Sequence, residues 1–178
     1  MTQKIEFAKG LITDSVDEYS ELINGVEYQK EELNEKAKSA VRFLYGKAEK
    51  YKLTHRPLDQ VCKPYEPLKI KNMENTILRP ELAMIKNGET IPCWIAEVSV
   101  TEDDPLPFLI KTHLYQSIGV KEYWVIVPEL EVIMVYTFEK SGFVPAIYNL
   151  PRRLKVSPYK EFFMSFTDIF KFERPEEH

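Results

Sequence analysis

The segment from Trp94 to Val127 constrains the fold more than any other part of the chain. It begins with an apolar run of strand length at residues 94–100 and continues through a polar, proline-containing connection into a helical pattern at about residues 107–118. Gly119 stands where a helix is expected to end, and residues 122–127 form a second apolar run. A strand, a helix and a strand in this order predict a right-handed crossover between parallel strands. We therefore expect an α/β fold, with a mixed β-sheet flanked by helices.

The flanking segments carry enough regular pattern to complete such a fold. Asn24-Gly25 is a strong turn signal between two short apolar pieces, so residues 21–28 are expected to form a hairpin. Residues 30–52 repeat apolar side chains at three- and four-residue spacing, which predicts a long amphipathic helix. The remaining expected elements are strands at residues 77–85, 131–138 and 143–148 and a packed, aromatic-rich tail at residues 157–170. The sequence shows no internal repeat or flexible linker, so residues 1–178 are expected to form a single domain.

Composition narrows the class of protein. The chain has 178 residues, of which 44% are apolar and 29% charged, which is ordinary for a globular protein with one core. Its net charge of −4 counts against tight nucleic-acid binding but allows a local basic groove. Cys62 and Cys93 lack metal-ligand spacing and are expected to be buried free thiols. Residues 1–10 do not resemble a signal peptide, and no segment approaches the ~20 apolar residues of a membrane span. We therefore expect a cytoplasmic protein with no membrane partner.

Three side chains are candidates for chemistry. Glu97 lies in the first strand of the crossover unit between apolar neighbours, and Glu81 lies in another short apolar run upstream. Lys111 lies on the helix that joins the two strands. Two carboxylates on neighbouring strands can bind a divalent cation, and the cation and a nearby amine can stabilise the negative charge at a phosphodiester. We therefore interpret Glu81, Glu97 and Lys111 as a nuclease-type catalytic site in which the two carboxylates are the metal ligands.

Each of these residues also has a simpler interpretation. Glu97 could be a structural carboxylate paired with a lysine, since a lone carboxylate among apolar neighbours is costly to bury. Glu81 could face solvent at a strand end, and Lys111 could be a solvated helix residue.

His113 is interpreted as a packed histidine on an apolar helix face rather than as a general base. The basic cluster at residues 152–155 is expected to be solvated surface, although it is the best candidate for a phosphate contact.

The identity and spacing of these residues resemble the Uma-type restriction endonuclease family, within the PD-(D/E)XK nuclease superfamily. Glu97-Val98 matches the Glu-Val of the family's catalytic strand, and Lys111 falls where the family places its helix lysine. Arg79-Pro80-Glu81 resembles the family's Arg-Pro-Asp, and residues 21–25 resemble its N-terminal hairpin. The positions after the lysine that match without a gap are Tyr115, Gly119, Val120, Glu122, Tyr123 and Trp124. The resemblance spans roughly residues 21–170.

The resemblance implies a restriction-endonuclease-like fold and a metal-dependent endonuclease that hydrolyses DNA. Glu81 and Glu97 would hold Mg²⁺ or Mn²⁺, which would activate a water molecule and offset charge on the phosphate. Lys111 would orient that water or neutralise the developing charge. Glu32 or Glu35, from the first helix, would complete the metal shell. Many nucleases of this fold dimerise to cut both strands, so a homodimer is expected by analogy.

The chain departs from the family pattern at several positions. The family's aspartate after Arg-Pro is Glu81 here, and two further family aspartates are replaced by Pro107 and Val127. Ser99 stands where the wider superfamily has its lysine, a role that this family moves to the helix. These departures and the acidic net charge support an alternative, a catalytically degenerate nuclease-fold protein that acts as a binding or assembly module. A further alternative is a metal-dependent hydrolase of another phosphoester.

Overall fold

The structure of the chain, a computed structural model, describes residues 20–100 and 106–172. Its helices are α1 (Glu35–His55), α2 (Leu106–Ile118) and α3 (Phe166–Phe170). Its strands are β1 (Ser20–Ile23), β2 (Val26–Gln29), β3 (Gln60–Cys62), β4 (Leu68–Lys69), β5 (Ile77–Leu78), β6 (Leu82–Ile85), β7 (Trp94–Val98), β8 (Glu122–Val127), β9 (Val132–Glu139), β10 (Gly142–Tyr148), β11 (Arg153–Lys155) and β12 (Phe163–Ser165).

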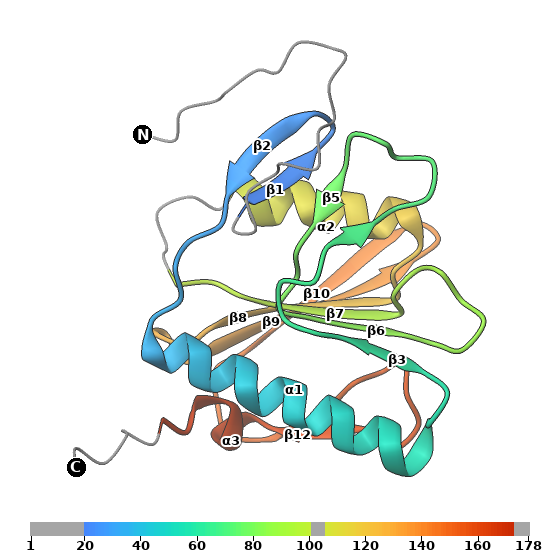
Figure 1. The fold of residues 1–178 in the computed structure, drawn as a ribbon. Coiled ribbons are helices and arrows are strands. Elements are labelled where there is room, and N and C mark those ends of the chain that lie inside the picture. Colours follow the sequence, from blue (N-terminus) through green and yellow to red (C-terminus); the bar gives the residue numbers. More distant parts are fainter. Residues whose placement is uncertain (1–19, 101–105, 173–178) are drawn as a thin grey trace.

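These elements form layers on both sides of a central sheet (Figure 1). The central sheet has six strands in the order β10-β9-β8-β7-β6-β3. α1, α3 and the paired strands β11 and β12 lie on one face, and α2 lies on the other face beside a second sheet in the order β2-β1-β5-β4. The expected α/β fold, a mixed sheet flanked by helices, is confirmed.

The expected crossover forms the middle of the central sheet. β7 and β8 pair in parallel and are joined by α2, whereas β6 pairs with β7, and β9 with β8, in antiparallel fashion. Both parallel strands are buried along their whole length, as strands covered on both faces must be. Because side chains alternate along a strand, Trp94 and Ala96 face α1, whereas Ile95 and Glu97 face α2.

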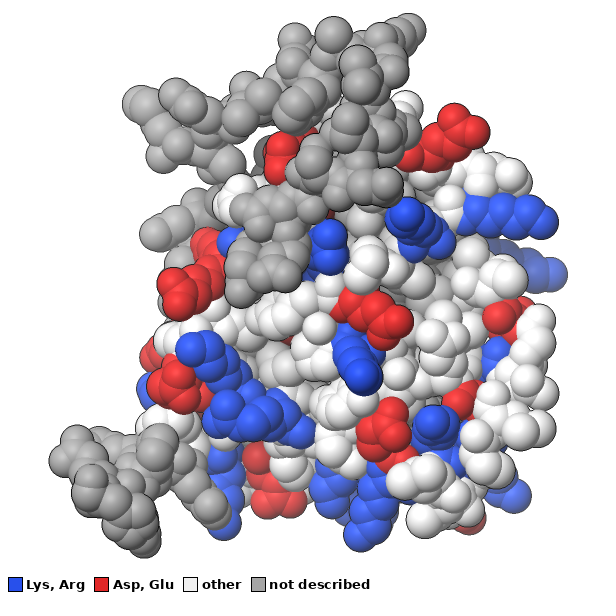
Figure 2. Space-filling view, in the orientation of Figure 1, with Lys and Arg blue, Asp and Glu red and all other residues white. Residues whose placement is uncertain are grey.

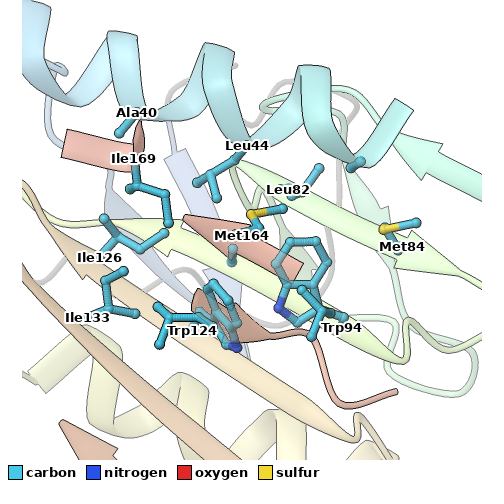
Figure 3. Packing of buried hydrophobic residues seen from close by; sticks show 14 of the residues in the cluster. Ala40, Leu44, Leu82, Met84, Trp94, Trp124, Ile126, Ile133, Met164 and Ile169 are labelled. Atoms are coloured by element: carbon cyan, nitrogen blue, oxygen red, sulfur yellow. The ribbon is translucent and has the colours of Figure 1, made fainter. Parts of the chain in front are cut away.

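The face toward α1 carries a large apolar core (Figure 3). Trp94 and Trp124 are fully buried and meet edge to face, with ring centroids 5.4 Å apart. Leu44 of α1 and Ile169 of α3 close over the sheet, so the C-terminal segment is part of this core. The expected packing of the aromatic tail is confirmed for Phe162 and Phe166, whereas Phe163 is exposed.

The first helix begins later than the sequence pattern predicts. It was expected at residues 30–52 but spans Glu35–His55. Asn34 caps its N-terminus by accepting a hydrogen bond from the backbone N–H of Ala37 at 2.9 Å, and Asn is a preferred residue at this position. Residues 30–34 are therefore a connection without helical structure, which allows Lys30 to reach the sheet.

The expected strand at residues 77–85 is two strands that belong to different sheets. β5 pairs with β1 and β4, whereas β6 pairs with β3 and β7. Pro80 separates them, because proline has no N–H to donate to a ladder and rarely continues a central strand. The chain passes from one sheet to the other at Arg79-Pro80-Glu81, and this passage places Glu81 beside β7.

The structure also bears on the two cysteines and on the expected absence of a membrane span. Cys62 and Cys93 are buried free thiols, as predicted, and burial raises the pKa of both. Among the described residues, no helix combines the length and the apolar character that a membrane crossing requires. The expectation about a signal peptide concerns residues 1–10, which lie outside the described part of the chain.

Candidate metal and catalytic site

Glu81 and Glu97 lie opposite each other on the face of the central sheet that α2 covers. β6 and β7 pair with Leu82 opposite Ala96, so the next position of the register places Glu81 opposite Glu97. Opposed residues of an antiparallel pair share one face and have Cβ atoms about 4.5–5.5 Å apart. Each glutamate is only 1% exposed, so the interpretation of Glu81 as a solvent-facing residue is wrong.

Among the described residues, three donors fix the carboxylate of Glu97. The Tyr115 hydroxyl donates to Oε1 at 2.8 Å, and the Tyr123 hydroxyl donates to Oε2 at 2.9 Å. The Lys111 ammonium lies 2.7 Å from Oε2. Both tyrosines are fully buried between α2 and the central sheet, so their rings are part of the core. Their hydroxyls have the further role of holding the Glu97 carboxylate in one orientation.

Lys111 joins two carboxylates in the buried layer between α2 and the sheets. It is 3% exposed, and its ammonium lies 2.8 Å from Oε2 of Glu21 in addition to its contact with Glu97. Oε1 of Glu21 accepts a hydrogen bond from the backbone N–H of Arg79 at 2.7 Å. The interpretation of Lys111 as a solvated helix residue is wrong. Sequence reasoning placed Glu21 only in the hairpin, although an acidic residue beside Leu22 and Ile23 was a signal that it needs a buried partner.

The electrostatics of this cluster keep Lys111 charged. Burial disfavours its charged form, but Glu97 and Glu21 more than offset that effect and raise the pKa of Lys111 above its usual value. Burial also raises the pKa of Glu21, but the Lys111 ammonium, Lys30 and the Arg79 N–H outweigh it and lower that pKa to about 2. For Glu81, burial prevails over the attraction of Lys30, and the neighbouring Glu97 adds to it, so its pKa is raised.

Lys30 is a second lysine of the cluster that sequence reasoning missed. Its ammonium lies 2.5 Å from Oε1 of Glu81 and donates to the backbone carbonyl of Arg79 at 2.5 Å. Oε2 of Glu81 accepts a hydrogen bond from the Val98 N–H at 2.9 Å. Nothing in the local sequence indicated this contact, because the pattern assigned residue 30 to a helix.

The acids expected from the first helix do not join the site. Glu32 and Glu35 are exposed, and Glu35 pairs with Lys38 at 3.1 Å on the surface of α1. Among the described residues no group of three or more His, Cys, Asp or Glu side chains has the arrangement of a metal shell. The structure therefore gives no support to the expectation that one of these acids completes the shell, and the described side chains leave the remaining coordination positions to other ligands.

His113 and the basic cluster at residues 152–155 lie outside the site. His113 is exposed, with its ring edge-on to Phe143 at a centroid distance of 6.0 Å, so the prediction of a packed histidine is wrong. The basic cluster at residues 152–155 belongs to the layer on the α1 side of the sheet, where Arg152 stacks over Tyr148 and Arg153 over Phe163. It therefore lies across the central sheet from Glu97.

The departures from the family pattern have local explanations. Pro107 lies in the first turn of α2, where a helix tolerates proline because the missing N–H would have no intrahelical partner. Val127 is a buried residue at the end of β8. The backbone N–H of Ser99 donates to the carbonyl of Ile126 at 2.8 Å, which extends the pairing of β7 and β8. None of these three residues supplies a carboxylate.

The donors present fit a hard divalent cation. Mg²⁺ and Mn²⁺ prefer oxygen ligands, and Glu81 and Glu97 provide carboxylate oxygens on one face of the sheet. Oε1 of Glu81 is buried and accepts no hydrogen bond of regular geometry from the described residues, so its contact with Lys30 is an ion pair. This oxygen is the one in the site that is best placed to accept a metal.

Comparison with known proteins agrees with this architecture. The sequence profile of the Uma2 family, described as "Putative restriction endonuclease", matches residues 11–162. The chain belongs to the Uma2 family. A solved structure described as "a putative nuclease belonging to DUF820" from Anabaena variabilis ATCC 29413 is similar to it with a TM-score of 0.69 and 16% sequence identity, covering 85% of this chain and 89% of that chain. A search of curated proteins finds no match. The Uma2 membership and the restriction-endonuclease-like fold expected from the sequence are confirmed.

Proposed function

We propose that this Uma2 protein is a metal-dependent endonuclease that hydrolyses phosphodiester bonds of DNA. The observation that carries the proposal is the Glu97 carboxylate, which is fixed by Lys111 and two tyrosines opposite the buried Glu81. Burying two facing carboxylates is costly, and such sites are frequently functional. The descriptions of the family and of the solved structure, both as nucleases, support the same class of reaction.

In this proposal Glu81 and Glu97 hold Mg²⁺ or Mn²⁺. The cation supplies Lewis acidity and positive charge for phosphodiester hydrolysis. Lys111 contributes a fixed positive charge and N–H donors, because the raised pKa keeps its amine protonated. It is therefore suited to orient a water molecule or to stabilise charge on the phosphate, and unsuited to remove a proton. Tyr115 and Tyr123 are positioning residues, since they act on Glu97 through hydrogen bonds.

DNA binding must depend on contacts with individual basic residues rather than on the electrostatic field of the whole protein. The net charge is −4, and Figure 2 shows Lys and Arg interspersed with Asp and Glu over the described part of one face. Phosphate contacts by individual basic residues weaken steeply as the salt concentration rises. Cleavage is therefore expected to be strongest at low ionic strength. Cutting both strands also favours two copies of the chain acting together, so a homodimer is part of the proposal.

The test is cleavage of plasmid and single-stranded DNA at low salt with Mg²⁺ or Mn²⁺. The parent protein should cleave, Glu97→Gln should lose at least a hundredfold in rate, and Glu35→Gln should cleave like the parent. Glu35 is a matched control because it is an exposed carboxylate outside the site. Equal cleavage by the parent and Glu97→Gln would reveal a contaminating nuclease and contradict the site.

A second function, a binding or assembly module without catalysis, has its own supporting observation. Both candidate metal ligands are already paired with lysines, and the described residues contain no larger group of metal-ligating side chains. A protein of this kind would show no rise in melting temperature with millimolar Mn²⁺. Inactivity of both the parent and Glu81→Asp, which restores the family's residue, would favour it over the nuclease.

A further inference from the structure

Lys30 is a nearly buried amine that the proposed catalytic chemistry does not use. It follows β2 directly and lies in the connection at residues 30–34, outside both helix and strand. Its side chain is 11% exposed, and its ammonium is 5.4 Å from the centre of the Tyr65 ring. An ammonium in this position requires partners that compensate for the loss of water.

The partners of Lys30 are the kinds of atom that bind a divalent cation. Its Nζ lies 2.5 Å from Oε1 of Glu81 and 2.5 Å from the backbone carbonyl oxygen of Arg79. Carboxylate and carbonyl oxygens are common ligands of hard divalent cations. The ammonium therefore occupies oxygen atoms that a metal ion could use.

The metal and Lys30 need the same atom of Glu81. Oε2 is engaged by the Val98 N–H at 2.9 Å, which is part of the local backbone arrangement. Oε1 is therefore the Glu81 oxygen that remains for a metal ion, and among the described residues its partner is the Lys30 ammonium. Two cations at one oxygen repel each other, so a metal that binds Oε1 must displace the amine.

Lys30 is easier to displace than Lys111. Lys111 is anchored on α2, is 3% exposed and contacts two carboxylates of the described residues. Lys30 is on an irregular connection and contacts one carboxylate in the same part of the chain. Replacing the Lys30 ammonium by a divalent cation also brings the net charge of the cluster closer to zero. The ionised carboxylates of Glu21, Glu81 and Glu97 with two ammonium groups sum to −1, and replacing one ammonium by a divalent cation brings the sum to 0.

We propose that Lys30 is a built-in competitor for the metal ion at Glu81. Without metal, its ammonium neutralises Glu81 and stabilises the fold. When a divalent cation binds, it replaces this ammonium at Glu81, while Lys111 stays in place. The exchange raises the metal concentration that the site requires, and the inference rests on the proposed metal-dependent function.

The test measures Mn²⁺ affinity by calorimetry on the full chain. Lys30→Met keeps the apolar stem and removes the charge, and Lys30→Gln also keeps a donor for the Arg79 carbonyl. Both variants should bind Mn²⁺ at least tenfold more tightly than the parent. Lys36→Met, which removes an exposed lysine paired with Glu129, should bind like the parent. Cooperative thermal unfolding of each variant checks that it is folded.

A second measurement uses the parent alone and so does not depend on the folding of a variant. Acetylation of amines, read by mass spectrometry, should leave Lys30 protected without Mn²⁺ and reactive with saturating Mn²⁺, while Lys111 stays protected in both states. Equal Mn²⁺ affinity of the parent and the Lys30 variants, or protection of Lys30 at saturation, would overturn the inference and leave the proposed function standing. No Mn²⁺ binding by the parent or by either folded Lys30 variant would overturn the metal-dependent function itself.

Discussion

At the scale of single residues, the site is a network in which every carboxylate oxygen has a partner. Lys111 bridges Glu97 and Glu21, and Lys30 pairs with Glu81. Two tyrosine hydroxyls and two backbone N–H groups are the other donors. Glu97 and Lys111 could be predicted from the sequence because they lie on adjoining elements of one crossover unit. The apolar neighbours of Glu21 indicated that it needs a buried partner, but the sequence could not place Glu21 or Lys30 in the site. Both reach it from the hairpin and the connection after it through tertiary folding alone.

Lys111→Met is expected to affect both stability and activity. It leaves Glu21 and Glu97 without their ammonium, and breaking a buried ion pair from one side costs about 3–5 kcal/mol. Hydrolysis, assayed below the variant's own melting temperature, should fall by roughly 10²–10³ because a fixed electrostatic contact is lost. Urea unfolding of the double variant with Glu21→Gln should recover part of the stability. Strictly additive losses would contradict the contact between these residues.

Tyr115→Phe is expected to destabilise the fold by about 1.5–3 kcal/mol, because the Glu97 carboxylate loses a hydrogen bond inside the protein. Tyr136→Phe is the matched control, since the one hydrogen-bond partner of that hydroxyl in the described part of the chain is the Met134 sulfur at 4.0 Å. Its unfolding free energy should stay close to that of the parent. Equal losses in the two variants would mean that the hydroxyl of Tyr115 has no special role at Glu97.

At the scale of elements, the passage from the second sheet to the central sheet determines where the site lies. Pro80 lies between β5 and β6, where the chain leaves the second sheet, and β1 places Glu21 in contact with Lys111 of α2. The hairpin, the crossover and the two strands after it could be predicted because each has a local pattern of apolar residues and turn residues. The division of residues 77–85 between two sheets could not, because it depends on which strand each half pairs with.

Glu21 links β1 to α2, and its pKa predicts how this link depends on pH. Its pKa in the folded protein, about 2, is below the usual value of 4.5, so ionised Glu21 stabilises the fold above about pH 4.5. That contribution is lost as the pH falls from 4.5 toward 2. The difference in urea midpoint between the parent and Glu21→Gln should therefore be largest at pH 6 and should shrink below pH 4. A difference that stays constant over this range would contradict the ion pair with Lys111.

Gly119 ends α2 and directs the chain into β8. Its φ of +99° lies where residues other than glycine are strained, although no atom of the described residues is within 4 Å of an added Cβ. Gly119→Ala should lower the unfolding free energy by about 1–2 kcal/mol through backbone strain alone. Gly46→Ala, inside α1 with equally open space, should raise it by about 0.5–1 kcal/mol. Thermal unfolding of the two variants, with shifts of opposite sign, checks this account.

At the scale of the whole molecule, the central sheet separates a large apolar core from the charged site. The face toward α1 is filled by tryptophans and aliphatic side chains, and the face toward α2 holds the charged cluster beside its own apolar residues. The sequence predicted this layered α/β architecture because the strands at the centre are continuously apolar and the first helix is apolar on one side. It did not predict the second sheet, whose strands β4 and β5 are too short to leave a pattern.

Anomalous diffraction from crystals soaked in Mn²⁺ would show directly whether Glu81 and Glu97 bind a metal ion together. We expect a peak between Glu81 and Glu97, with carboxylate oxygens of both residues about 2.0–2.6 Å from the ion. Lys111 should remain on Glu97, and the Lys30 ammonium should have left Glu81. Crystals that take up no Mn²⁺ between these carboxylates at saturating concentration, with both lysines still paired as they are here, would contradict the metal-dependent nuclease.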